Sequence, residues 1–231
     1  MSPHRSIIAT GGACFIVGAL AFVGVFSYLA ANFDYPNVLD GTAADVLPKL
    51  RDGGSTMRAV WALYAFLPLL LIPGAVGAWF ACPTSRGRMT VAVLAVSIGA
   101  LAMCLGLMRW PSLHWMLADT YARADDAARL GIDAVFDGMN VYLGNYIGEF
   151  LGETLLASFF LLTGRSMLAE GRYPAWLGWG GIAFALLFIV GAFRNVTAIV
   201  QPVADLNNSL LPLWMIVLGI AMIRFGTRAE A

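Results

Sequence analysis

The sequence predicts an all-α, polytopic transmembrane helical bundle of about six spans, with short helices in its outer loops. Of the 231 residues, 60% are hydrophobic and only 12% are charged, whereas a soluble domain carries about 25% charged residues. The mean hydropathy is +0.77, and apolar residues are spread along the whole chain. We therefore expect a single integral membrane domain over residues 1–231.

Six apolar segments approach the roughly 20 residues that a helix needs to cross a bilayer. The first is longer than the 7–15-residue apolar core of a signal peptide, so we expect it to be retained as a span. The predicted spans are about residues 7–31, 58–80, 89–109, 139–163, 175–194 and 207–225.

Arginine placement predicts which side of the membrane each loop faces. The short loops carry Arg86, Arg88, Arg165 and Arg172, whereas the long loops 32–57 and 110–138 carry most of the aspartates. Seven basic residues lie on each side of the membrane, but the loops on the side opposite the termini are longer. The density of basic residues is therefore higher on the side of the termini, which favours cytoplasmic termini. With Lys49 as the single lysine, the composition also indicates a GC-rich genome, and we expect a multi-pass protein of the bacterial cytoplasmic membrane.

The long outer loops contain further helical patterns. Residues 42–51 could form a surface helix that Pro48 interrupts, since proline cannot donate a backbone hydrogen bond. Pro111 and Ser112 are a plausible helix start before 113–121, and residues 125–137 keep a helical apolar spacing. We therefore expect the fourth transmembrane helix to begin outside the membrane.

Several function classes are excluded or disfavoured. The formal net charge is +0, so no basic face for nucleic acid is expected. The three cysteines lack metal-ligand spacing. Phosphate-loop and hydrolase-elbow motifs are absent, and a single loop lysine excludes a retinal Schiff base within a span. No cofactor and no oligomeric state is indicated.

The fourth span contains two glutamates, Glu149 and Glu153. A carboxylate in hydrocarbon is costly, so such residues usually face a bundle interior and have partners. On an α-helix, Tyr142, Asn145, Glu149 and Glu153 share one face. This face is the strongest candidate site in the sequence.

Possible partners for the glutamates lie at the outer ends of other spans. Arg58, Arg109 and Arg194 could compensate the two carboxylates, and His114 follows the third span. We expect these groups to gather in the outer half of the bundle, either as a structural charge network or as a ligand-binding cluster.

Four interpretations of this cluster remain open. It could be a Glu–Arg network that fixes helix register, or an outer-leaflet polar pocket that binds a lipid, a small amphiphile or a membrane partner. A membrane-embedded enzyme could use Glu149, Glu153 and His114 with a metal, although no metal-binding motif is present. Proton-coupled transport is a further alternative. Non-catalytic binding at the outer leaflet is the leading hypothesis.

Several strings in the chain support a family resemblance. They are the run FDYP at 33–36 with Val38 and Leu39, the run RWPSLHW at 109–115, the stretch 140–153, and the ending LNN…LPLW within 206–214. The pattern resembles a family of bacterial multi-pass membrane proteins catalogued only as a domain of unknown function. The resemblance implies a six- or seven-helix membrane fold over nearly the whole chain, and no particular chemistry.

Overall fold

The structure is a computed structural model that describes residues 3–227. Within that range every regular element is helical and no strand occurs. Six helical runs are long and apolar enough to cross a membrane, and each predicted span lies within one of them. The all-α, multi-pass fold class is thereby confirmed. The six runs are Pro3–Phe33, Gly54–Ala81, Pro83–Tyr121, Asp126–Glu170, Ala175–Asn195 and Ala198–Gly226.

Most of these runs consist of more than one element, as the following bounds show. They contain α1 (Pro3–Phe33), α3 (Gly54–Phe66), η2 (Leu67–Leu70), α4 (Leu71–Ala81), η3 (Pro83–Ser85), α5 (Arg86–Met108), η4 (Trp110–His114), α6 (Trp115–Tyr121), α7 (Asp126–Met139), η5 (Asn140–Leu151), α8 (Gly152–Glu170), α9 (Ala175–Ala192), η6 (Phe193–Asn195), η7 (Ala198–Val200), α10 (Gln201–Ala221) and η8 (Met222–Gly226). Between the first two runs lie η1 (Asn37–Asp40) and α2 (Ala43–Asp52).

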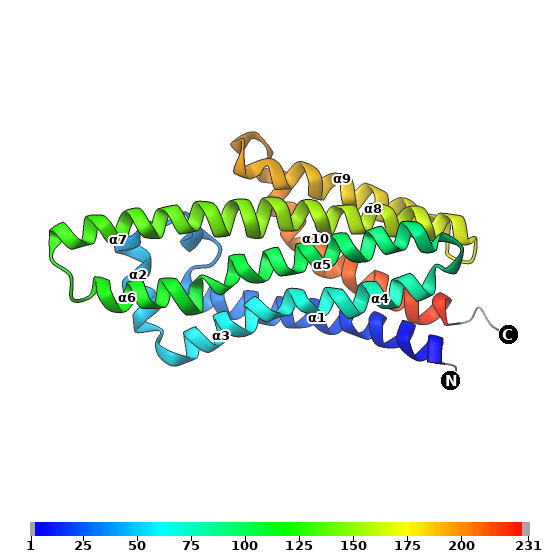
Figure 1. The fold of residues 1–231 in the computed structure, drawn as a ribbon, viewed down its shortest axis with the longest axis horizontal. Coiled ribbons are helices and arrows are strands. Elements are labelled where there is room, and N and C mark those ends of the chain that lie inside the picture. Colours follow the sequence, from blue (N-terminus) through cyan, green and yellow to red (C-terminus); the bar gives the residue numbers. More distant parts are fainter. Residues whose placement is uncertain (1–2, 228–231) are drawn as a thin grey trace.

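The long helices run side by side along one axis (Figure 1). The first helix, α1, begins at the same end of the molecule at which the last helix, η8, finishes (Figure 1). We call this the terminal end and the opposite end the distal end. The runs α5–α6 and α7–α8 extend beyond the other helices at the distal end (Figure 1). The protruding ends of these two runs, together with α2 and residues 34–42, form what we call the distal cap.

The helices are packed in a ring. α1 contacts α4 and α10, α5 contacts α4 and α8, and α9 contacts α8 and α10. Glycines bring the backbones close at several of these crossings, since a Cβ on Gly11 would lie 2.7 Å from the Gly77 Cα and a Cβ on Gly106 would lie 2.7 Å from the Gly148 Cα. Small residues at such crossings allow the close contact by which membrane helices associate.

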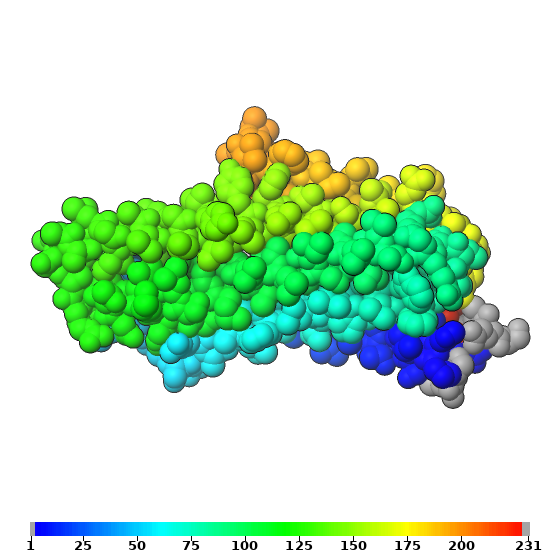
Figure 2. All heavy atoms as spheres, in the orientation of Figure 1, coloured from blue at the N-terminus to red at the C-terminus, as the bar shows by residue number. Residues whose placement is uncertain are grey.

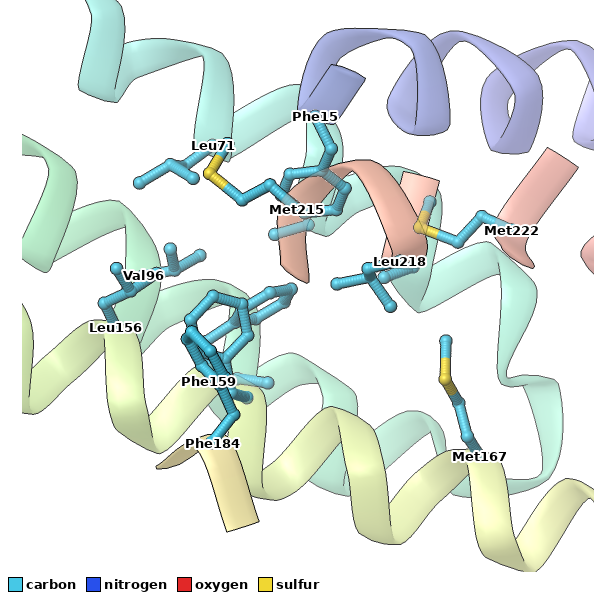
Figure 3. Packing of buried hydrophobic residues seen from close by; sticks show 14 of the residues in the cluster. Phe15, Leu71, Val96, Leu156, Phe159, Met167, Phe184, Met215, Leu218 and Met222 are labelled. Carbon is cyan, nitrogen blue, oxygen red and sulfur yellow. The ribbon is translucent and has the colours of Figure 1, made fainter. Parts of the chain in front are cut away.

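An apolar core fills the terminal half of the ring. Figure 3 shows Phe15, Phe159, Met215 and Leu218 converging from different helices, with no polar side chain among the labelled residues. The rings of Phe15 and Phe159 lie 5.9 Å apart. The core of this half is therefore held by apolar packing, while hydrogen bonds such as that from the Tyr173 hydroxyl to the Ala81 carbonyl, at 3.1 Å, join the helix ends.

The cap helices begin where their capping residues predict. The Thr42 hydroxyl accepts a hydrogen bond from the Asp45 N–H, and the Asp125 carboxylate accepts one from the Ala128 N–H at 2.8 Å. The fourth helix does begin in the cap, at Asp126. Pro48, however, does not interrupt α2. The carbonyl that it leaves without a partner belongs to the exposed residue Ala44 in the first turn, where water can satisfy it.

Candidate functional site

The guanidinium of Arg194 joins both glutamates of the fourth run. Its Nη1 and Nη2 donate to Oε2 and Oε1 of Glu153 at 2.7 and 2.8 Å, and its Nη2 lies 2.9 Å from Oε2 of Glu149. A bidentate pair of this kind is among the strongest charge-assisted contacts. One arginine therefore serves two carboxylates, and we call the three residues the Arg194 triplet.

The end of α9 positions this arginine. The helix stops at Ala192, and the tight turn of η6 brings Arg194 against the fourth run while its Nη1 also donates to the Gly191 carbonyl at 3.3 Å. The side chains of the triplet are mostly covered but not fully buried, with 14% of Arg194, 15% of Glu153 and 27% of Glu149 exposed. The triplet thus lies at an edge of the bundle and not at its centre.

The helix that carries the glutamates differs from the predicted α-helix. Residues Asn140–Leu151 form a π-helix, in which backbone N–H groups bond to carbonyls five residues earlier, and α8 begins only at Gly152. The expected common face of four polar residues changes accordingly. Tyr142 is 60% exposed, Asn145 is half-buried without a hydrogen bond among the described residues, and only Glu149 and Glu153 reach Arg194.

Arg109 has a different partner from the one expected. Its Nε donates to Oδ1 of Asn140 at 3.0 Å and its Nη1 donates to the Gly106 carbonyl. The guanidinium lies on Gly144, where a Cβ would come within 2.5 Å of Nη2. Gly144 is thus needed for the approach of Arg109, and Asn140 is a site neighbour that the sequence reasoning missed.

The structure brings neither Arg58 nor His114 into contact with the glutamates. Arg58 donates to the Pro111 carbonyl at 2.9 Å and lies over the Trp115 ring. His114 is fully buried between Trp110 and Phe136, at centroid distances of 4.8 and 4.7 Å. Within residues 3–227 no three His, Cys, Asp or Glu side chains gather as they would around a metal ion, so the expected donor set of His114 with Glu149 and Glu153 does not form.

Two tyrosines that the sequence reasoning missed lie next to each other, one in the loop after α1 and one on α3. The hydroxyls of Tyr35 and Tyr64 are 3.4 Å apart. Burial raises the pKa of the Tyr35 hydroxyl, its hydrogen bond with Tyr64 opposes that rise, the carboxylate of Glu149 adds to it, and the charges of Arg109 and Arg194 oppose it. Tyr35 therefore lies within electrostatic range of these three charged groups. A tyrosine in a loop gave no sequence signal for this position beyond its place in the FDYP string.

Exposed apolar side chains lie on both sides of Arg194 along the chain. In the segment after α9, Phe193 is 43%, Val196 61% and Ile199 87% exposed. Tyr146 of the fourth run donates a hydrogen bond from its hydroxyl to the Asn195 carbonyl of this segment. Figure 2 shows this segment as a protrusion from the side of the molecule. The arrangement thus combines charged groups with an apolar border, as the headgroup and the chain of an amphiphile require.

Comparison with known families gives one match. The model of the family described as Domain of unknown function (DUF4386) matches residues 10–225. The chain belongs to this family. The match confirms the resemblance to a membrane-protein family of unknown function, and it includes both glutamates and Arg194. No curated protein and no solved structure matches the chain.

Proposed function

We propose that this protein is a non-catalytic integral membrane protein that binds a lipid or another small amphiphile at the Arg194 triplet. The observation that carries the proposal is the partial exposure of a compact charge cluster beside an apolar surface. Charged groups within a membrane usually face the bundle interior and pair with one another. The triplet leaves a charged edge that a headgroup can reach.

Glu149 is the member most open to a ligand. It offers one oxygen to Arg194, whereas Glu153 offers both. Among the described residues Glu149 accepts no further hydrogen bond, and it has the largest exposed fraction of the three side chains. A headgroup that carries a hydrogen-bond donor can therefore bind Glu149 without breaking the bidentate pair.

The location that we propose for the site is the outer leaflet of a bacterial cytoplasmic membrane. The density of arginines at the terminal end supports cytoplasmic termini, and six spans leave both termini on one side. The distal cap then faces outward, and the triplet lies at the end of α9, which stops short of the cap (Figure 1). The enzyme alternative needs His114 beside the carboxylates, whereas the His114 ring is packed between the rings of Trp110 and Phe136.

Native mass spectrometry after mild detergent extraction tests the proposal. We expect the wild-type protein to retain a lipid or small molecule, and Glu149→Gln and Arg194→Gln to lose most of it. Tyr142→Phe is the matched control, since Tyr142 lies in the same helical segment but is exposed and outside the triplet.

The stability of each variant is measured alongside its lipid retention. Equal retention in all variants, with reduced stability in Arg194→Gln alone, would show that the triplet only fixes the helices. Glu149→Gln preserves the size of the side chain and the Arg194–Glu153 pair, so it keeps the test meaningful if Arg194→Gln folds poorly.

A further inference from the structure

The distal cap contains a cleft that is separate from the Arg194 triplet. It has a volume of about 330 Å³ and lies where α2, α6 and the start of α7 meet. A cleft of this size is at the lower end of the range for small-molecule sites. Its lining residues are Ala44, Pro48, Arg51, Asp52, Ala118, Tyr121, Ala122 and Arg129.

Two arginines reach this cleft from different helices, Arg51 from α2 and Arg129 from α7. The Arg51 Nε lies 3.6 Å from Asp119 Oδ1, and the Arg129 Nη1 lies 3.8 Å from Asp126 Oδ1. Both distances exceed that of a hydrogen bond. Within the described part of the chain neither guanidinium donates a hydrogen bond, and the Nε of Arg129 is buried without a partner. Each arginine thus has an aspartate within ion-pair distance but no hydrogen bond to it, so a ligand carboxylate can compete for the guanidinium N–H groups.

The remaining walls hold one arginine in place and leave room for a ligand. The guanidinium of Arg129 lies 5.0 Å from the centroid of the buried Tyr121 ring, a contact that fixes its plane. Alanines at positions 44, 118 and 122 supply apolar surface without filling the space. This arrangement suits the bidentate recognition of an oxyanion by a guanidinium oriented in advance.

We propose that the cleft binds a small organic monocarboxylate with a short apolar body. The carboxylate would accept hydrogen bonds from Arg51 and Arg129, and the alanines would cover the apolar part. Asp52 also lines the cleft, and Asp119 and Asp126 lie within ion-pair distance of the two arginines, so the negative charge of these carboxylates disfavours anions with two charges. The cleft is in the cap, away from the triplet, so this site is independent of the proposed amphiphile site.

Saturation-transfer NMR titration of the detergent-solubilised full-length protein tests the proposal, with butyrate as the probe. Butyramide has the same shape without the charge and serves as the ligand control. We expect butyrate to bind and butyramide not to bind. Arg51→Gln and Arg129→Gln should each weaken butyrate binding about tenfold or more, because each removes charge-assisted hydrogen bonds.

Two further variants separate the cleft from general surface charge. Arg123→Gln removes an arginine of the same cap that does not line the cleft, and it should leave butyrate binding unchanged. Ala122→Leu fills the cleft from an exposed position without changing charge, and it should abolish binding. Equal effects of all three arginine variants, or equal binding of butyrate and butyramide, would overturn the proposal. Tighter binding of inorganic phosphate than of butyrate would overturn the choice of a carboxylate.

Discussion

The terminal and distal halves of this bundle are held together by different kinds of contact. In the terminal half, glycines such as Gly11 and Gly77 bring helices together around a core of phenylalanine and methionine. In the distal half, Trp61 and Trp110 stack at 4.6 Å, and charged groups such as Arg109 and Arg194 bond across helices. The core of the terminal half is thus packed by shape, with its hydrogen bonds at the helix ends, whereas in the distal half directional contacts enter the space between the helices.

The difference follows from the side chains that each half contains. In the core of the terminal half the facing helix surfaces are apolar, so close backbone approach is an important source of stability there. The distal half carries polar groups that need partners and holds the cap above them. Rigid aromatic side chains and ion pairs supply both order and satisfied hydrogen bonds there.

The largest effect that we expect comes from removing Trp61, the centre of an aromatic cluster in the distal half. Trp61→Ala should lower the free energy of unfolding by about 3–5 kcal/mol, because a fully buried ring that contacts Phe33, Tyr35 and Trp110 leaves a cavity. Denaturant unfolding in detergent gives this value. Trp179→Ala is the control, since Trp179 is 63% exposed and should change stability little. Similar losses in both variants would show that the cluster is not a special source of stability.

A smaller effect is expected at the glycine crossing of the terminal half. Gly11→Val should cost about 1–3 kcal/mol through overpacking, because its Cβ would lie 2.7 Å from the backbone of Gly77. Gly24 is on the same helix with nothing within 4 Å of an added Cβ, so Gly24→Val should be nearly neutral. Thermal unfolding of the two variants measures the difference. A Gly24→Val protein as unstable as Gly11→Val would remove the argument for close packing at this crossing.

The smallest effect concerns Tyr35, where the cap meets the polar cluster. Its hydroxyl pKa is raised in the folded protein from the ordinary value of 10.0, so the folded state keeps this proton to a higher pH than the unfolded state does. The contribution to stability is therefore complete below pH 10 and decreases as the pH rises through the folded pKa. Tyr35→Phe should remove part of the alkaline loss of stability, and at pH 7 it should cost about 1 kcal/mol or less. Unfolding curves between pH 7 and 11 test this, and an unchanged alkaline slope would contradict it.

Much of the fold could be predicted from the sequence because it depends on local composition. The six spans follow from the length of the apolar runs, and the cap helices follow from residues such as Thr42 and Asp125 that satisfy the first backbone N–H groups. The π-helical form of residues 140–151 could not be predicted in this way. Its backbone hydrogen bonds depend on how the segment packs against α5, where Gly106 meets Gly148.

The sequence by itself determined that this is a multi-pass helical membrane protein and that the two glutamates need partners, because the cost of burying a carboxylate in hydrocarbon is a property of the residue. Only the tertiary structure decided that Arg194 is the partner and that Arg58 and Arg109 bond elsewhere. It alone brought the hydroxyls of Tyr35 and Tyr64 together and placed Arg51 and Arg129 in the lining of one cleft in the cap. Such choices depend on which distant segments become neighbours, and apolar periodicity determines the burial of a helix without determining its neighbours.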